Sequence, residues 1–377
     1  MTLTIFTNCV HHHQIPIADE FYKILGEKFQ LVAMQQLPQQ LVNGGYDPNI
    51  ERPYIVRAYK NSKQQVIAKN LMLESDVVIV SYGPVKEMIE RIKNNKITFF
   101  NSERWLKQKW RIFDVRFLYR TYFYHYRYRN NRSYMLCSSA FTAEDVKKFN
   151  CYLGKCFKWG YFTRVDDINR GYDNINDVVR FMWCARFLSW KHPELPMKLA
   201  QRLKAKGFRI QMDMFGSGTL LESTKTMAMD LGVDDIVSFC GNLPNEEILK
   251  QMEVHDIFLF TSDRREGWGA VANEALSNGC ILIASNEIGA IPFLVKEGIN
   301  GFIFRSCDID SLEEVVVEVF KKKNQWPIIQ KNAIKTMHDI WSPETAAKNF
   351  LRLVEYIIKD KLDQYDFSNG PAGIIKD

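Results

Sequence analysis

The residues with the clearest capacity for chemistry are Glu266 and Glu274, which stand eight positions apart. Glu266 falls in a Gly-rich turn after the apolar run Ile257–Phe260, and Glu274 falls about two turns into the helix predicted next. Gly267 and Gly269 offer backbone N–H groups at a helix N-terminus, which favours a phosphate. Carboxylates beside such an anion site suit a ligand that also carries hydroxyl groups, because a carboxylate accepts strong hydrogen bonds from them.

The elements that would position these residues form one α/β unit. Residues 257–260 are predicted to be a buried strand, residues 270–278 a helix that Gly279 ends, and residues 281–284 the next strand. The loop between strand and helix lies at the carboxyl end of a strand, where open parallel sheets bind ligands. Taken alone, Glu266 would be interpreted as a carboxylate at a helix start and Glu274 as a solvated helix residue. The residues around them determine whether a ligand-binding role is the better interpretation.

Those surrounding residues resemble a known family. EGWG-x-x-x-x-EAL-x-x-G, followed by a strand and by Asn300, Gly301 and Phe302, is similar to the signature of family-4 retaining glycosyltransferases of the GT-B type. The resemblance implies that Glu274 holds the ribose hydroxyls of a nucleotide-diphosphate sugar and that Glu266 holds the hydroxyls of the donor sugar. It also places a donor-binding set in this half of the chain, namely Gly267, Trp268, Gly269, Gly216, Asn242 and Leu243.

Two cations follow the strand predicted at residues 178–185. The segment ARFLSWK, with Arg186 and Lys191, resembles the family's Gly-Arg-Leu…Lys-Gly segment, whose Arg and Lys clamp the nucleotide diphosphate. Cations at the end of a strand can neutralise a departing pyrophosphate. The sequence departs from the family pattern at Ala185 and at His192, which both stand where the family has glycine.

In the first half, the polar residues at predicted strand ends are His11, His12, His13 and Glu103. His12 or His13 would contact the acceptor, although solvated loop histidines are an equal alternative, and consecutive loop residues seldom chelate one metal ion. Glu103 stands near the position of a family histidine and could orient or deprotonate an acceptor hydroxyl. Its alternative role is a surface carboxylate paired with Arg104.

Residues 104–134 interleave nine Lys and Arg with eleven aromatic residues. We expect a long helix whose aromatic side chains fill the core, with Arg116, Arg120 and Arg127 along one stripe. The basic, aromatic edge of that helix could rest on an anionic membrane, because Tyr and Trp suit the interface and basic residues are attracted to it. No nucleic-acid-binding motif accompanies the segment, so we expect no nucleic-acid partner.

Composition sets the wider bounds. A chain of 377 residues fits two domains, and residues 1–170 carry 26 Lys and Arg against 15 Asp and Glu, a charge of +11 within a total of +6. The basic half is expected to face something anionic. Eight scattered cysteines indicate reduced, buried thiols, and no membrane span or signal peptide is visible. These features favour a cytoplasmic protein, peripheral on the inner face of the cell membrane.

The Asp308-x-Asp310 pair is a metal signature in other glycosyltransferases, but Asp310 precedes a predicted helix at residues 312–320 and is interpreted as its N-cap. We therefore expect no metal and no cofactor beyond the UDP- or GDP-sugar.

Together these features predict an α/β protein of the GT-B fold, with two doubly wound Rossmann-like domains facing across a cleft. We expect an acceptor-binding domain at 1–162, a linker at 163–176, a nucleotide-sugar-binding domain at 177–342, a helix at 343–362 that crosses back to the first domain, and a loose tail at 363–377. The predicted activity is that of a retaining, metal-independent hexosyltransferase with Glu266, Arg186, Lys191 and Glu103 as catalytic residues. Its acceptor would be a glycan or lipid-linked saccharide of bacterial polysaccharide, LPS or capsule synthesis. The alternative is a non-catalytic GT-B-fold binder of an anionic polymer or membrane.

Overall fold

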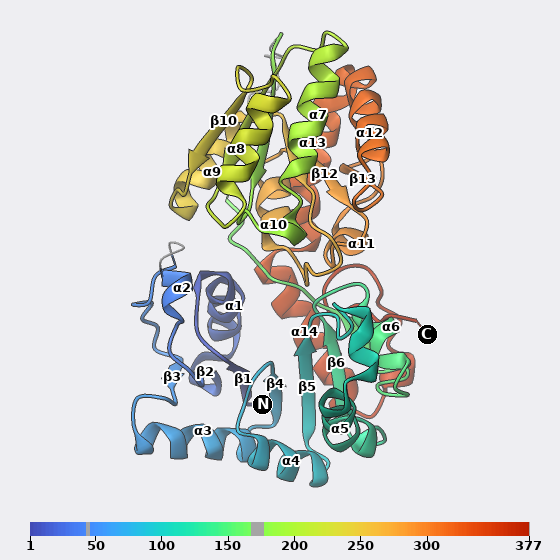
Figure 1. Cartoon of the computed structure of the whole chain (residues 1–377). Helices are drawn as coiled ribbons and strands as arrows, with labels where there is room; N and C mark the ends of the chain where they lie inside the picture. The colour runs from blue at the N-terminus through green and yellow to red at the C-terminus, as the bar shows by residue number, and fades with distance from the viewer. Residues whose placement is uncertain (43–45, 167–176, 377) are drawn as a thin grey trace. The chain divides into compact units, whose positions relative to one another are not determined.

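The chain forms two compact units in the computed structural model, which describes residues 1–42, 46–166 and 177–376 (Figure 1). Unit 1 combines Met1–Arg164 with Ile340–Asp377, and unit 2 is Val165–Asp339. Most of the predicted linker, residues 167–176, lies outside the described residues. In the part of the chain that the structure describes, no helix combines the length and the apolarity needed to cross a membrane.

The described residues of unit 1 contain a seven-stranded parallel sheet in the order β3-β2-β1-β4-β5-β6-β7. The strands are β1 Leu3–Thr7, β2 Phe29–Ala33, β3 Ile55–Arg57, β4 Val77–Val80, β5 Ile97–Ser102, β6 Ser133–Cys137 and β7 Cys156–Lys158. The chain leaves β1 toward β2 on one side and resumes with β4 on the other. The carboxyl ends of β1 and β4 therefore border the crevice where such sheets bind ligands.

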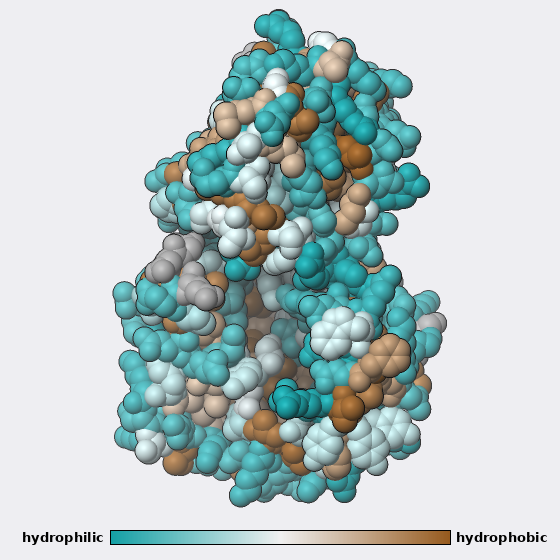
Figure 2. Space-filling view, viewed as in Figure 1, coloured by the Kyte–Doolittle hydropathy of each residue, from teal (hydrophilic) through white to brown (hydrophobic). Residues whose placement is uncertain are grey.

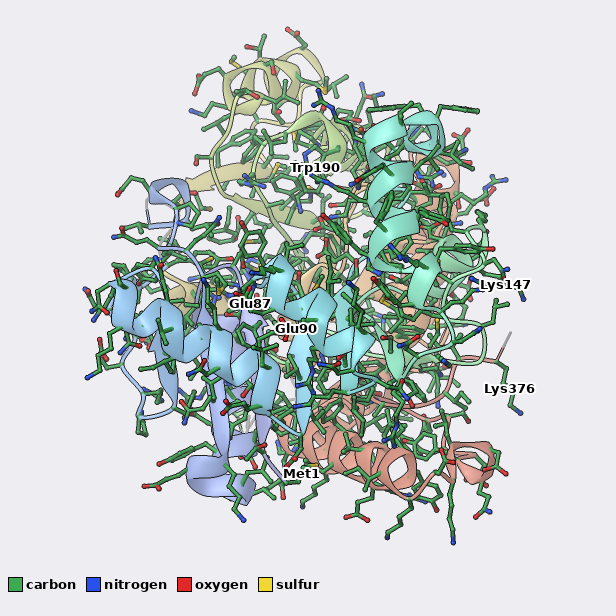
Figure 3. All side chains as sticks on the ribbon, turned by 90° about the horizontal axis from the view of Figure 1, so that it is seen from below. Met1, Glu87, Glu90, Lys147, Trp190 and Lys376 are labelled. Atoms are coloured by element: carbon green, nitrogen blue, oxygen red, sulfur yellow. The ribbon has the colours of Figure 1, made fainter. Side chains whose placement is uncertain are left out.

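Helices cover both faces of this sheet. They are α1 Ile15–Leu25, α2 Gln39–Val42, α3 Ser62–Glu74, α4 Val85–Lys93, α5 Val115–Tyr124, α6 Thr142–Lys147 and α14 Pro343–Ile358, with short helical turns η1 His12–Gln14, η2 Gly26–Lys28, η3 Lys109–Phe113, η4 Tyr126–Tyr128 and η8 Leu362–Gln364. Alternate strand residues point to opposite faces. Phe6 and Phe100 share a core cluster with Met72 of α3, whereas Phe99 contacts Phe350 of α14. Helices α3 and α4 lie side by side, as Figure 3 shows with Glu87 and Glu90 labelled on α4, and α14 packs on α1.

The described part of unit 2 contains a six-stranded parallel sheet in the order β10-β9-β8-β11-β12-β13. The strands are β8 Val179–Cys184, β9 Ile210–Phe215, β10 Val237–Gly241, β11 Ile257–Phe260, β12 Ile281–Ser285 and β13 Gly301–Phe304. The helices are α7 Glu194–Ala205, α8 Leu221–Asp230, α9 Asn245–Val254, α10 Ala270–Ser277, α11 Ile291–Leu294, α12 Ile309–Lys321 and α13 Trp326–Lys335, with short turns η5 Ser189–Lys191 and η6 Lys323–Gln325 and a π-helix Thr336–Ile340 that runs on into unit 1. The order reverses between β8 and β11, so the carboxyl ends of these two strands form the ligand-binding edge of this sheet.

These sheets confirm the predicted fold class of two doubly wound Rossmann-like domains. The apolar runs that predicted buried strands are the central strands: the run at 257–260 is β11, and all four of its residues are buried. Strands that helices cover on both faces are apolar along their length, and this explains why runs without alternation were reliable signals.

The expected long helix at residues 104–134 is wrong. The segment is broken into η3, α5 and η4, because the Asp114 carboxylate caps α5 by accepting hydrogen bonds from the N–H groups of Arg116 and Phe117. Helix α5 ends at Tyr124, so Arg127 lies beyond it and the expected arginine stripe does not extend along one helix. Many of its aromatic side chains are on the surface rather than in the core; Phe113 is 81% exposed.

Two further expectations are corrected. The N-cap of α12 is Asp308, whose carboxylate accepts from the N–H groups of Asp310 and Ser311, so the helix begins earlier than expected. The predicted loose tail is packed: Ala372 N donates to Lys158 O and Lys158 N donates to Gly373 O, both over 2.7 Å. These bonds attach the segment to the outer edge of β7, where an unpaired strand edge would otherwise face solvent.

Candidate functional site

The turn after β11 has a backbone shape that only glycine permits at Gly269. This residue has a φ of +92°, and a Cβ there would lie 2.5 Å from the Phe260 ring. Helix α10 starts at the next residue. Because the first N–H groups of a helix have no partner within the helix, this tight entry directs free donors toward the carboxyl end of β11.

Lys191 and Glu266 form an ion pair at this edge. Both side chains are 12% exposed, so solvent screens the pair only in part. The Lys191 ammonium group lies 4.2 Å from the centre of the Trp190 ring. The Lys191 carbonyl accepts a hydrogen bond of 2.6 Å from Thr261 Oγ1, directly after β11. Two predicted site residues are therefore brought together, with the loop after β8 joined to the loop after β11.

Glu274 lies inside α10 and is only 7% exposed. Its carboxylate accepts a hydrogen bond of 3.0 Å from Asn245 Nδ2. Burial raises the pKa of Glu274 to about 7, against the lowering effect of this hydrogen bond. Cys184, at the end of β8, lies close enough for both Glu274 and Lys191 to influence the pKa of its thiol, which burial raises. Glu274 is thus a buried group of the helix that follows β11, and it is not the solvated helix residue of the alternative interpretation.

Arg186 lies two residues beyond the end of β8 and is exposed. Among the described residues its guanidinium group forms no ion pair, so it can accept an anionic partner. The loop that carries Arg186 is held by Gly216, where φ is +128° and a Cβ would lie 2.0 Å from the Ala185 carbonyl oxygen. The glycine is therefore required by the close approach of two loops. This requirement explains the isolated GxG without a dinucleotide-binding motif.

The remaining residues predicted to bind the donor differ in which groups they present to a ligand. Asn242 Nδ2 donates to Ser217 Oγ over 3.0 Å, and this bond places the loop after β10 beside the loop after β9. Leu243 is half-buried next to it. The Trp268 indole is fully buried, and its Nε1–H donates to Asn273 Oδ1 over 2.8 Å. That side chain is therefore a core group, and only the backbone of Trp268 remains for a ligand.

His192 is the residue whose surroundings sequence reasoning missed. It has a left-handed backbone, with a φ of +52°, at a position where the family pattern has glycine. Its Nδ1 lies 2.7 Å from Glu194 Oε1, its Nε2 lies 3.4 Å from Asp263 Oδ2, and Cys307 Sγ lies 3.2 Å from the same Nε2. The hydrogen bond with Glu194 is the main cause that raises the pKa of His192. The departure from glycine at this position was the signal available in the sequence. Cys307 and Cys240 are exposed, so the expectation of buried thiols is wrong for these two.

Unit 1 contains a cavity of about 910 Å³ at the carboxyl ends of β1, β4, β5 and β6, and Figure 2 shows the surface of this unit hollowed. Its lining includes Glu103 and His13 among the predicted residues; His12 is not part of the lining. The Glu103 carboxylate forms an ion pair with Lys107 and accepts a hydrogen bond of 2.7 Å from the Tyr161 hydroxyl. Glu103 is therefore a fixed wall group of the cavity.

The three adjacent histidines are drawn together at the start of η1. The ring centres of His12 and His13 are 3.9 Å apart, and that of Tyr46 is 4.5 Å from His12. Burial, assisted by the neighbouring His12, lowers the pKa of His11 to about 4. Burial alone lowers the pKa of His125, which also lines the cavity, to about 4. Near neutral pH these two imidazoles therefore carry no charge.

The fold is shared with solved glycosyltransferase structures. The structure of Anabaena HepE in complex with UDP superposes with a TM-score of 0.68 at 13% identity, over 94% of this chain and all of that one. The apo form of the lipopolysaccharide outer core galactosyltransferase WaaB superposes with a TM-score of 0.68 at 14% identity, over 95% of this chain and all of that one. At such identities the likeness establishes the fold alone, which is the GT-B fold.

The sequence comparisons concern a narrower part of the chain. Residues 172–336 match the family model "Glycosyl transferases group 1", a range that includes Arg186, Lys191, Glu266 and Glu274. The chain is 26% identical over 152 residues to the amylovoran biosynthesis glycosyltransferase AmsK of Erwinia amylovora, covering 39% of this chain and 37% of that protein. It is 28% identical over 138 residues to a GDP-mannose-dependent phosphatidylinositol monomannoside mannosyltransferase of Mycolicibacterium smegmatis, covering 35% of this chain and 36% of that protein. Each match spans little more than a third of the relative's length.

Proposed function

We propose that this protein is a retaining, metal-independent glycosyltransferase. It would move a hexose from a nucleotide-diphosphate sugar to a glycan or lipid-linked acceptor during synthesis of a bacterial surface polysaccharide, LPS or capsule. The observation that carries the proposal is the Lys191–Glu266 ion pair at the carboxyl ends of β8 and β11, with the buried Glu274 in the helix that follows β11. Arg186, which forms no ion pair among the described residues, lies on the adjoining loop. Two cations and two acids at the reversal point of a parallel sheet suit a ligand that carries both phosphates and hydroxyls.

The chemistry assigned to these residues is electrostatic. Arg186 and Lys191 would stabilise the negative charge that develops on the diphosphate as its bond to the anomeric carbon breaks. The backbone N–H groups between Gly267 and Gly269 would assist from the start of α10. The acceptor oxygen bonds to the anomeric carbon on the face that the diphosphate leaves, and the acceptor proton passes to a diphosphate oxygen.

The two acids would hold the donor. Glu274 would accept hydrogen bonds from the ribose hydroxyls, and Glu266 from the hydroxyls of the sugar. The Lys191–Glu266 pair would keep both groups in position before the donor binds. UDP is bound in the HepE structure, and the mycobacterial relative is described as GDP-mannose-dependent. Both names support a nucleoside diphosphate as the leaving group.

The proposal is tested by measuring whether the protein cleaves a nucleotide sugar when no acceptor is added. Purified protein is incubated with UDP-glucose, UDP-galactose or GDP-mannose, and the released nucleoside diphosphate is measured. We expect slow release from one donor and a loss of about 10²–10³-fold in Lys191→Met, because one charge-stabilising group is removed. Lys198→Met is the matched control, since Lys198 is an exposed residue of α7 that is not part of the Lys191–Glu266 pair. Binding of a donor that is never cleaved would favour the non-catalytic alternative instead.

We also propose that unit 1 binds an anionic membrane through η3 and α5. Exposed aromatic and aliphatic side chains gather there: Trp110, Phe113, Val115, Tyr119 and Tyr122 are between 50% and 81% exposed. Figure 2 shows apolar and intermediate residues on the surface in the region where Figure 1 places α5. Lys109 and Arg116 are exposed beside them. Aromatic rings suit the interfacial region of a bilayer, and each nearby basic residue adds about 1 kcal/mol of attraction to anionic lipid.

Vesicle flotation tests this surface. We expect binding to phosphatidylglycerol vesicles that weakens with salt and falls at least about tenfold in Lys109→Glu/Arg116→Glu, because two attractions become repulsions. Arg209→Glu/Arg305→Glu makes the same change in charge on exposed residues of unit 2. Equal binding by the two double variants would exclude η3 and α5 as the membrane surface.

A further inference from the structure

The cavity of unit 1 has a charge distribution that identifies part of its ligand. Its wall is built from the loops after β1, β4 and β5 together with η3 and α5. The charged side chains in the lining are Glu103, Arg104, Lys107, Arg111 and Arg120. Four of these five are cations, and a cation that already pairs with a carboxylate has less charge to offer a ligand.

Two of the four cations are neutralised within the wall. Lys107 forms the ion pair with Glu103 described above. Arg104 is 8% exposed, and its Nε lies 3.7 Å from Asp145 Oδ2, which is itself almost fully buried. Burial raises the pKa of Asp145, and the hydrogen bond from Leu106 N and the charge of Arg104 act in the opposite direction. These two pairs leave no carboxylate of the lining unpaired.

Arg111 and Arg120 remain, and within the described residues neither forms an ion pair. Arg111 is held in place: its Nη1 donates to the Trp105 carbonyl over 3.2 Å, and its guanidinium carbon lies 4.7 Å from the centre of the Phe117 ring. Arg120 follows Phe117 by three residues in α5, so both arginines come from the η3–α5 part of the cavity wall. Both residues are exposed, and their charge is therefore available to an entering ligand.

Other groups in the lining are polar without being charged. The His11 and His125 imidazoles are neutral there at pH 7, and the hydroxyl groups of Ser81 and Tyr82 lie in the same lining. Such groups hydrogen-bond to saccharide hydroxyls without selecting for charge. The cavity lining thus combines two arginines that can bind an anion with neutral polar groups that suit a sugar.

We propose that this cavity binds the acceptor as a glycosyl phosphate, with the phosphoryl group on Arg111 and Arg120 and the sugar on the neutral polar groups of the lining. The assignment rests on the proposed function, since it names the acceptor class of that transferase. A guanidinium group matches the oxygens of a phosphoryl group with paired N–H donors, and a phosphoryl group offers more oxygens than a carboxylate to two such guanidinium groups, whether it is a monoester with a charge near −2 or a diester with a charge of about −1. The phosphoryl group can belong to a free sugar phosphate or to a phospholipid headgroup.

The test compares glucose 1-phosphate, glucuronate and glucose by calorimetric titration of the full-length protein. We expect glucose 1-phosphate to bind at least about tenfold more tightly than either of the others, which corresponds to about 1.4 kcal/mol. The variant Arg111→Gln/Arg120→Gln should lose that advantage. The control Lys93→Gln/Lys147→Gln removes the same charge from exposed residues of unit 1 outside the lining (Lys147 in Figure 3) and should keep it.

The outcomes separate this inference from the proposed function. Equal affinity of the native protein for glucose 1-phosphate and glucose, or unchanged affinity in the double arginine variant, overturns the inference. Donor cleavage by the native protein decides the proposed function independently of either result. A competition experiment distinguishes the two sources of the phosphoryl group. If phosphatidylinositol vesicles displace bound glucose 1-phosphate, the ligand is a lipid headgroup; if they do not, the ligand is a free glycosyl phosphate. A folded double variant is confirmed by circular dichroism and by its unfolding temperature.

Discussion

Lys191 and Glu266, 75 positions apart in the sequence, meet as an ion pair at the carboxyl ends of two adjacent strands of unit 2. The pair is largely shielded from solvent, so its strength lies between that of an exposed pair and that of a buried one. It joins a cation assigned to the leaving diphosphate with an acid assigned to the donor sugar. Donor binding would therefore act on a pair that is already formed, and single changes should affect stability and turnover together.

Removing one member of the pair should leave the other charge half-buried without its partner. We expect Lys191→Met and Glu266→Gln each to lower the free energy of unfolding of unit 2 by about 1–3 kcal/mol. The double variant should recover part of this loss, because it leaves no unpaired charge. Urea unfolding of the four proteins measures the coupling. A coupling energy near zero would show that the pair contributes nothing in solution.

Glu274 should make both stability and donor binding depend on pH. Its folded pKa of about 7 lies above its ordinary value of 4.5, so its contribution to stability is full below pH 4.5 and is lost as the pH rises through 7. Glu274→Gln should therefore gain stability relative to the native protein between pH 5 and pH 8, by roughly 2–3 kcal/mol. Unfolding temperatures across this range check the sign.

The same carboxyl group should couple donor binding to proton release. If Glu274 accepts hydrogen bonds from ribose hydroxyls, it must be ionised in the complex, so the native protein should bind UDP or GDP more tightly at pH 8 than at pH 6. Glu274→Gln should bind more weakly, with little dependence on pH. Calorimetric titration with UDP or GDP at pH 6 and pH 8 measures these affinities. A native affinity that is independent of pH would contradict the role assigned to Glu274.

His192 combines a strained backbone with a stabilising contact. The hydrogen bond with Glu194 raises its pKa, so the contact stabilises the fold fully below the ordinary value of 6.5 and is lost as the pH rises through the folded value. His192→Gly relieves the left-handed backbone, by about 1 kcal/mol, and removes the contact. We expect the glycine variant to be no more stable than the native protein at pH 6 and more stable at pH 9.

The control for His192 is Asn150→Gly. Asn150 has a similar φ of +54° and no titrating side chain. Its glycine variant should shift the unfolding temperature by a constant amount across the same pH range. A pH-independent shift in His192→Gly as well would mean that Glu194 does not hold the imidazole in solution.

The C-terminal residues should contribute strongly to the stability of unit 1. Tyr365 is 3% exposed and its hydroxyl donates to the Ala372 carbonyl over 2.9 Å. A chain shortened after Asp363 loses this buried aromatic group and the bonds to β7, so its free energy of unfolding should fall by at least about 3 kcal/mol. Removal of residues 376–377 alone should have little effect. Chemical unfolding of both shortened chains provides the comparison.

The sequence predicted most accurately those elements whose signal is local. The buried strands were visible as apolar runs because both faces of each sheet are covered, and β11 is the clearest case. The Lys191 and Glu266 segments were recognised by residue type and spacing at strand ends. Their direct pairing was not predicted, since contact between two loops depends on the order of strands in the sheet.

The prediction missed one local helix cap and two features that depend on tertiary contacts. Residues 104–134 have helical composition, but Asp114 caps a new helix in the middle of the segment. The tail has no periodic pattern, and its order comes from bonds to β7, which lies more than 200 positions earlier. His192 meets Cys307 across 115 positions. For the tail and for His192 the deciding partner is distant in the sequence, whereas Asp114 is a local capping signal that the prediction did not use.

The division of unit 1 between the two ends of the chain also orders its assembly during synthesis. Unit 2 lies wholly between the two segments, so all of it is translated before α14 and the residues that bond to β7. Until then Phe21 and Phe99 lack the Phe350 ring that they contact in the finished protein. The nascent first segment therefore has an uncovered apolar face while unit 2 is being synthesised. We expect chaperones to bind mainly to that first segment.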